Sequence, residues 1–129
     1  MDTPAPAKPL PGPMLKILLV EDHEDTLRAM SRLLRTLEYR VTTATCISTA
    51  LKVAAAEDFD LLISDMRLPD GSGMQLIKEL LARRPIKGIA LSGYGEESDI
   101  QQTKEAGFQK HLTKPINFLA LQAAIQEVK

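Results

Sequence analysis

The sequence predicts an α/β fold in which a parallel five-stranded sheet lies between two layers of helices. Two observations support this prediction. Short apolar runs of strand length alternate with segments whose apolar residues recur at helical spacing. Each apolar run also ends at polar or turn residues, as strands buried on both faces of a sheet do. Strands that alternate with helices are joined by right-handed crossovers, so the strands should be parallel in a single three-layer sandwich.

The central strand is predicted at residues 61–65, where four mostly apolar residues lead directly into Asp65. Pro69, Asp70 and Gly71 follow and turn the chain away from the sheet. The other predicted strands cover residues 16–20, 40–44, 88–91 and 110–113. The predicted helices cover residues 25–37, 47–56, 74–81, 96–106 and 118–128.

Apolar spacing predicts which face of each helix is buried. The third helix is marked by Met74, Ile77 and Leu81. The last helix, which Asn117 should cap, carries its apolar side chains on one face at Phe118, Leu121, Ile125 and Val128. The segment 96–106 has few apolar anchors beyond Ile100 and Ala106, so we expect its helix to be among the least stable elements.

Length and composition restrict the classes of function. A chain of 129 residues has the length of one domain, and its net charge of −1 argues against a general nucleic-acid or membrane binder. No apolar run approaches a bilayer span, and the single Cys46 cannot form an internal disulfide, which fits a cytoplasmic location. Residues 1–13 hold five of the eight prolines and are predicted to be a tail or linker before a domain at residues 14–129.

The strand ends carry the residues that point to chemistry. Glu21 and Asp22 follow the first strand, Asp65 ends the third, and Ser92 and Lys114 follow the fourth and fifth. The carboxyl ends of parallel strands meet at one edge of the sheet, so these side chains should converge. Two carboxylates about 5 Å apart repel each other by roughly 3 kcal/mol at an effective dielectric constant of about 20. A site that keeps all three carboxylates must therefore either protonate one of them or hold a cation, and hard oxygen ligands favour Mg²⁺.

Such a site is suited to phosphoryl transfer. The Asp65 carboxylate is a candidate nucleophile that attacks phosphorus and becomes an acyl phosphate. Mg²⁺ and the Lys114 ammonium would neutralise charge on the phosphoryl oxygens, and the Ser92 hydroxyl would donate a hydrogen bond to one of them.

These motifs resemble the response-regulator receiver domain of two-component signalling over residues 15–129. The resemblance rests on the acidic pair, on Asp65 with its downstream Pro69 and Gly71, on Ser92, and on Lys114-Pro115. It implies a flavodoxin-like (βα)5 fold with strand order 2-1-3-4-5. It also implies that a histidine kinase or a histidine phosphotransfer protein donates the phosphoryl group to Asp65 in a His-Asp phosphorelay.

The resemblance assigns further roles. Asp22 and Asp65 would bind Mg²⁺ directly, and Glu21 would bind it through water. Arg67 would contribute its backbone carbonyl as a further ligand. The Lys114-Pro115 peptide bond would be cis. Ser92 would move inward on phosphorylation. His111 occupies a position at which similar receivers usually carry Tyr or Phe, so we predict either a half-exposed edge residue or a switch residue. His23 is predicted to be a loop residue that protonates readily and is not a metal ligand.

Alternatives follow from particular residues. An aspartyl-nucleophile phosphatase needs an acid two residues after its nucleophile, where this chain has Arg67. A flavin-binding electron carrier with this topology would place its phosphate where the acidic pair repels it. A degenerate receiver that only binds proteins would lack the intact site. The Ser92-Gly93-Tyr94-Gly95 stretch resembles the C-terminal receivers of hybrid histidine kinases, so we expect that origin, or else a stand-alone regulator, as a monomer or weak dimer.

Overall fold

The computed structural model describes residues 15–93 and 97–128, so the predicted tail at 1–13 and the Tyr94-Gly95 part of the glycine-containing stretch lie outside it. Five parallel strands form the central sheet in the order β2-β1-β3-β6-β7, which confirms the predicted order 2-1-3-4-5. The strands are β1 (Lys16–Val20), β2 (Arg40–Ala44), β3 (Leu61–Asp65), β6 (Lys87–Ser92) and β7 (Lys110–Thr113).

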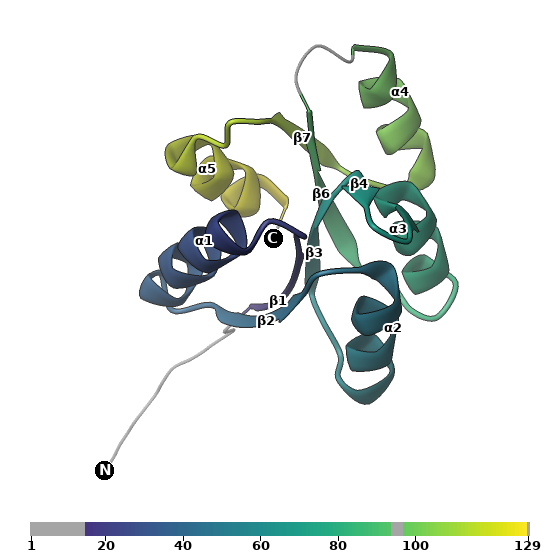
Figure 1. Ribbon diagram of the computed structural model, residues 1–129, viewed down its shortest axis with the longest axis horizontal. Helices are drawn as coiled ribbons and strands as arrows, with labels where there is room; N and C mark the ends of the chain where they lie inside the picture. The colour runs from purple at the N-terminus through teal and green to yellow at the C-terminus, as the bar shows by residue number, and fades with distance from the viewer. Residues whose placement is uncertain (1–14, 94–96, 129) are drawn as a thin grey trace.

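Helices cover both faces of the sheet, as Figure 1 shows. Helices α1 and α5 lie on one face, and α2, α3 and α4 lie on the other. Their bounds are α1 (Glu24–Thr36), α2 (Ile47–Ala56), α3 (Gly73–Leu81), α4 (Glu97–Ala106) and α5 (Phe118–Val128). Within residues 15–93 and 97–128, no helix is long and apolar enough to cross a bilayer.

A two-residue period along the strands divides the core into two layers. Ile17 and Leu19 of β1 pack in the cluster under α1 and α5, whereas Leu18 and Val20 pack in the cluster under α2, α3 and α4. All four side chains have no exposed surface. This burial on both sides explains why β1 reads as a continuous apolar run.

The ends of two helices differ from the predicted faces. Phe118, the first residue of α5, is 42% exposed, and Leu81, the last residue of α3, is 38% exposed. Phe118 was predicted to lie on the apolar face of the last helix and Leu81 to mark the third helix, so the buried part of each face does not extend to these terminal residues. The buried residues of α5 are Leu121, Ala124, Ile125 and Val128.

The N-termini of α5 and α2 are capped by side chains, the first from the adjacent residue and the second from a distant loop. Asn117 caps α5 as predicted, since its Oδ1 accepts hydrogen bonds from the N–H groups of Leu119 at 2.8 Å and Ala120 at 3.1 Å. Helix α2 is held from another loop, because the two carboxylate oxygens of Asp70 accept from the N–H groups of Ile47 at 2.8 Å and Ser48 at 3.0 Å. Asp70 was predicted only as a turn residue.

The turn that contains Asp70 is itself a small hairpin. Strands β4 (Arg67–Leu68) and β5 (Gly71–Ser72) pair antiparallel directly after β3. This hairpin was not predicted, because each strand has only two residues and shows no periodicity. It returns the chain to the start of α3 beside Asp65.

Candidate functional site

Three charged side chains from three segments meet at the carboxyl edge of the sheet. The Lys114 Nζ atom lies 2.7 Å from Asp65 Oδ2 and 2.9 Å from Glu21 Oε1. The Glu21 side chain is fully buried, Asp65 is 7% exposed and Lys114 is 25% exposed. The lysine therefore already balances part of the carboxylate repulsion that the sequence predicted for this edge.

Strand alternation explains why these carboxylates face each other. Glu21 continues the side of β1 that carries Ile17 and Leu19, and Asp65 continues the side of β3 that carries Ile63. Both side chains consequently point toward the α1 and α5 layer.

The lysine reaches this point from strand β7. The Lys114 N–H donates to the Ser92 carbonyl at 2.9 Å, and the Lys114-Pro115 peptide bond is cis, as the family resemblance implied.

Burial and charge shift the pKa values of the three groups. Burial raises the pKa of Asp65, and neighbouring Glu21 adds to the rise while Lys114 opposes it. Burial alone would raise the pKa of Glu21, but Lys114 and the N–H groups of His23 outweigh burial, so this pKa lies below its usual value. The pKa of Lys114 is raised, because its hydrogen bonds to Asp65 and Glu21 exceed the opposing effect of burial. The three groups thus form one ionic unit.

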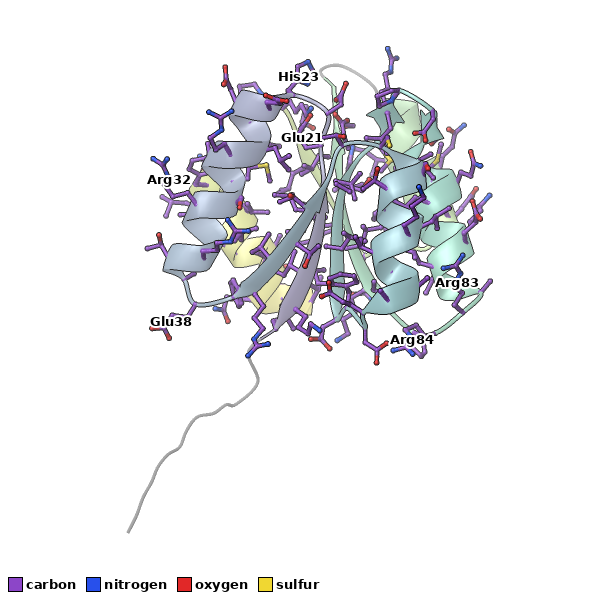
Figure 2. The ribbon with its side chains drawn as sticks, turned by 60° about the horizontal axis from the view of Figure 1, so that its bottom comes forward. Glu21, His23, Arg32, Glu38, Arg83 and Arg84 are labelled. Carbon is purple, nitrogen blue, oxygen red and sulfur yellow. The ribbon has the colours of Figure 1, made fainter. Side chains whose placement is uncertain are left out.

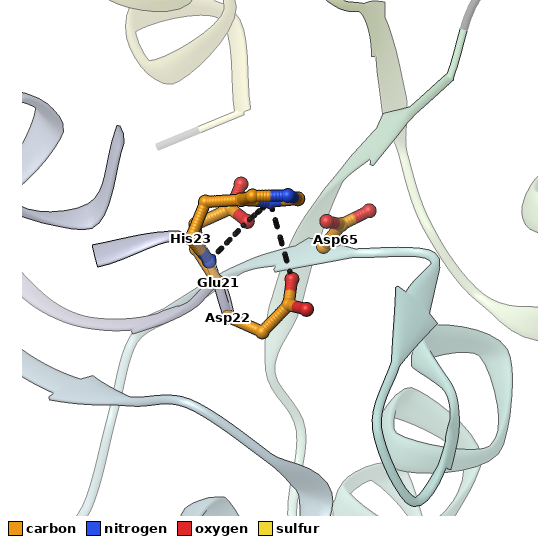
Figure 3. Close-up of side chains that lie close together, drawn as sticks. All are labelled: Glu21, Asp22, His23 and Asp65. Carbon is orange, nitrogen blue, oxygen red and sulfur yellow. Dashed lines mark hydrogen bonds and ion pairs between the residues drawn. The ribbon is translucent and has the colours of Figure 1, made fainter. Parts of the chain in front are cut away.

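Asp22 and His23 extend the site along the loop between β1 and α1, shown in Figures 2 and 3. The Asp22 side chain is 33% exposed, and its Oδ1 lies 3.4 Å from His23 Nδ1. The Glu21 Oε2 atom accepts a hydrogen bond from the His23 backbone N–H at 3.1 Å and lies 3.1 Å from His23 Nδ1. The imidazole ring thus lies against the carboxylates.

The donor set fits a divalent cation. Glu21, Asp22, His23 and Asp65 each offer one ligand atom, and these atoms lie within 4.8 Å of one another. Within the described residues, the buried Asp22 Oδ1 atom lies 3.4 Å from His23 Nδ1 but accepts no well-directed hydrogen bond, whereas Glu21 Oε1 is paired with the Lys114 ammonium. Buried carboxylate oxygens with unused acceptor capacity are suited to Mg²⁺.

Ser92 and His111 form a second part of the site, in which a hydrogen bond joins them. The Ser92 Oγ atom and the His111 Nε2 atom are 2.5 Å apart and hydrogen-bonded. Ser92 is buried, and His111 is half-buried on β7 as predicted. Leu112 packs toward the α1 and α5 layer, so His111 faces the opposite layer, which contains α4. The role of these two residues in switching stays a prediction.

The segment after Asp65 closes around it. The Arg67 N–H donates to Asp65 Oδ1 at 3.3 Å, which places Arg67 beside the carboxylate, while its role as a metal ligand stays a prediction. Gly73 begins α3 so close to β3 that a Cβ atom there would lie 2.4 Å from the Asp65 carbonyl oxygen. Gly73 was not among the predicted site residues, because its only signal in the sequence is a glycine just before a predicted helix.

Comparisons with known proteins agree with this geometry. A sequence model of the response regulator receiver domain matches residues 17–126. The response regulator protein PilR of Pseudomonas aeruginosa is 34% identical over 103 residues, which are 79% of this chain and 23% of PilR. The KDP operon transcriptional regulatory protein KdpE of Escherichia coli is 34% identical over 113 residues, 88% of this chain and 50% of KdpE. The chain therefore spans half or less of these two relatives.

A solved structure shows the same arrangement. The chemotaxis protein CheY4 of Vibrio cholerae superposes with a TM-score of 0.85 at 28% identity, and the match covers 91% of this chain and all of CheY4. The sequence match covers most of the chain, and it includes the three strands whose carboxyl ends bring Glu21, Asp65 and Ser92 to one edge of the sheet. The chain therefore belongs to the response regulator receiver domain family.

Proposed function

We propose that this chain is the phosphoacceptor of a His-Asp phosphorelay and that Asp65 is the residue phosphorylated. An Asp65 carboxylate oxygen attacks the phosphorus of a phosphohistidine on a histidine kinase or a histidine phosphotransfer protein. The new O–P bond forms as the P–N bond breaks, and the imidazole of the donor leaves. The observation that carries this proposal is the Lys114 ammonium 2.7 Å from the attacking carboxylate, where it can neutralise a phosphoryl oxygen.

The acidic residues would hold Mg²⁺ beside this nucleophile. Asp22 and Asp65 are the proposed direct ligands, with the Arg67 carbonyl as a third and Glu21 acting through water. The bound ion supplies positive charge to the phosphoryl oxygens as they approach a carboxylate. The buried Asp22 Oδ1 atom, which accepts no well-directed hydrogen bond within the described residues, supports this assignment.

The switch is proposed to lie between β6, β7 and α4. Before phosphorylation the Ser92 hydroxyl is hydrogen-bonded to His111. A phosphoryl group on Asp65 offers stronger acceptors, so Ser92 would turn toward it and release the imidazole. Helix α4 follows β6 in the chain, so it is the element that this exchange would move.

Other proposals follow from the sequence. Arg67 stands where an aspartyl phosphatase needs an acid for its leaving group, so a receiver is favoured over that enzyme. We retain an origin in a hybrid histidine kinase, or a stand-alone regulator, as a prediction, together with a cytoplasmic location and a monomeric or weakly dimeric state.

Phosphorylation by a small donor tests the proposal. The chain is incubated with acetyl phosphate and Mg²⁺, and its intact mass should increase by one phosphoryl group. Asp65→Asn should show no increase. Asp58→Asn is the matched control, because Asp58 precedes β3 at the opposite end of the sheet and pairs with Arg84, so this variant should be phosphorylated like the parent. An unchanged mass gain in Asp65→Asn would disprove the assignment.

A further inference from the structure

The His23 side chain does not cap the helix that it precedes. His23 is the N-cap residue of α1, yet its side chain makes no capping hydrogen bond. Asn, Asp, Ser or Thr normally fill this position, because their short side chains reach the free N–H groups of the first turn. The His23 ring instead turns toward the carboxylates of Glu21 and Asp22, as Figure 3 shows.

The separation of its ring nitrogen from Asp22 Oδ1 is close to that of neighbouring ligands on one ion, whereas Glu21, proposed to act through water, is hydrogen-bonded to the ring. Nδ1 lies 3.1 Å from Glu21 Oε2 and 3.4 Å from Asp22 Oδ1. Adjacent ligands of a six-coordinate ion with bonds of about 2.1 Å are about 3.0 Å apart, and opposite ligands about 4.2 Å apart. The four candidate ligand atoms, including one from Asp65, lie within 4.8 Å of one another, so small side-chain movements bring them to these distances.

The ring also has room to rotate, because most of its surface faces solvent. The His23 side chain is 71% exposed, so neighbouring side chains hold it only loosely. The atoms it approaches include Asp22 Oδ1, which is buried and accepts no well-directed hydrogen bond within the described part of the chain. Metal binding requires the tautomer with the lone pair on Nδ1 and the proton on Nε2, in which the ring would share one ion with Asp22 in place of its hydrogen bond to Glu21.

We propose that His23 supplies a nitrogen ligand to the metal site and shifts its selectivity from Mg²⁺ toward borderline ions such as Mn²⁺ and Co²⁺. This inference rests on the metal site of the proposed function and changes the earlier expectation that His23 is only a loop residue. Mg²⁺ prefers oxygen ligands, whereas imidazole binds first-row transition metals well. An all-oxygen site already binds Co²⁺ somewhat more tightly than Mg²⁺. The contribution of His23 is therefore the decrease in the ratio of Co²⁺ to Mg²⁺ affinity when the ring is removed.

Calorimetric titration of the untagged chain with Co²⁺ and with Mg²⁺ measures this contribution. We expect His23→Ala to weaken Co²⁺ binding by at least about tenfold, the scale on which groups around a metal affect its affinity. Mg²⁺ binding should change little. Glu24→Gln is the matched control, because Glu24 is the next residue in the chain, is exposed and pairs with Arg28 outside the site. Its ratio of Co²⁺ to Mg²⁺ affinity should equal that of the parent.

Pulsed electron paramagnetic resonance of bound Mn²⁺ provides a direct readout of the ligand. The chain has two histidines, so coupling of Mn²⁺ to an imidazole nitrogen can be assigned by removing each in turn. The coupling should be present in the parent and in His111→Asn and absent in His23→Ala. Coupling that persists in His23→Ala, or an equal loss of Co²⁺ and Mg²⁺ affinity there, would overturn the inference.

These results separate this inference from the proposed function. If Mg²⁺ binds and Asp65 is phosphorylated while His23→Ala leaves the selectivity unchanged, only the role of His23 is wrong. If the parent binds neither ion, the metal site and the role of His23 are both overturned.

Discussion

Helices α4 and α5 flank the same edge strand, β7, on opposite faces of the sheet, and they are held very differently. Helix α5 buries Leu121, Ala124, Ile125 and Val128. Among residues 100–106 of α4, only Thr103 and Ala106 are buried, and Ile100 is half-buried. Apolar burial is the main source of helix stability in a folded domain, so α5 is anchored and α4 is comparatively loose.

The two parts of the functional site follow the same division. On the α5 face, Lys114 links Glu21 and Asp65 through short ion pairs among buried groups. On the α4 face, one hydrogen bond joins Ser92 to His111. The proposed phosphoacceptor chemistry thus lies on the face that α5 anchors, and the proposed switch lies on the face covered by the less buried α4. Each prediction below tests this difference.

The largest effect should come from removing apolar side chains on the two helices. Ile125→Ala removes a fully buried side chain of α5 and should lower the free energy of unfolding by about 2–5 kcal/mol. Ile100→Ala removes the half-buried counterpart on α4 and should cost well under half as much. Urea denaturation of the two variants measures both values. Equal losses would show that α4 is anchored as firmly as α5.

The ionic unit should show the next largest effect. Lys114→Gln leaves two buried carboxylates without their cation and should lower the free energy of unfolding by about 1–3 kcal/mol, a range reduced for the partial exposure of the lysine. Lys110→Gln is the control, because Lys110 begins β7, the strand that Lys114 follows, and pairs with Glu127 at an exposed site. Thermal unfolding in a metal-free buffer compares them. A control as unstable as Lys114→Gln would contradict the importance of the buried unit.

Amide hydrogen exchange tests the loose face directly. Addition of beryllofluoride with Mg²⁺, which mimics a phosphoryl group on Asp65, should change exchange rates in α4 and at the end of β6. Rates in α5 should stay nearly constant, because its buried side chains do not depend on the switch. Asp65→Asn should show no change in either helix. Equal protection of α4 with and without the analogue would refute the switch.

The smallest effect on stability should come from the start of α2. Two hydrogen bonds to Asp70 hold this helix end, so their loss shows how much a few hydrogen bonds contribute to anchoring a helix. The two N–H groups that donate to Asp70 lower the pKa of this exposed carboxyl. A lowered pKa means that the carboxylate stabilises the fold at pH values above the pKa of the unfolded chain and loses this contribution as the pH falls through the folded pKa. Asp70→Asn should therefore be less stable than the parent at neutral pH, and the difference should shrink in acid. Thermal unfolding between neutral and acidic pH measures it, and a constant difference would be inconsistent with this cap.

Much of the site could be predicted because its signals are local. Asp65 follows a buried strand and precedes turn residues, and Glu21 follows another such strand, so the rule for parallel sheets placed them together. The bounds of β1 and β3 followed from mostly apolar runs, those of β2 from β-branched residues, and the end of the weaker strand β7 from Lys114-Pro115. The exposure of Phe118 was not foreseen, because helical spacing identifies an apolar face but not how far along the helix that face is buried.

The sequence by itself determined the succession of strands and helices along the chain, the apolar face of most helices and the set of charged residues at one edge of the sheet. Apolar periodicity and turn residues act over a few positions, so they can be recognised without a structure. Only the tertiary structure decided that Asp70 caps a helix 23 residues earlier, that Gly73 must leave room for the Asp65 carbonyl and that the His23 ring faces two carboxylates. Such contacts depend on the directions in which separate loops place their side chains, and local sequence patterns do not specify those directions.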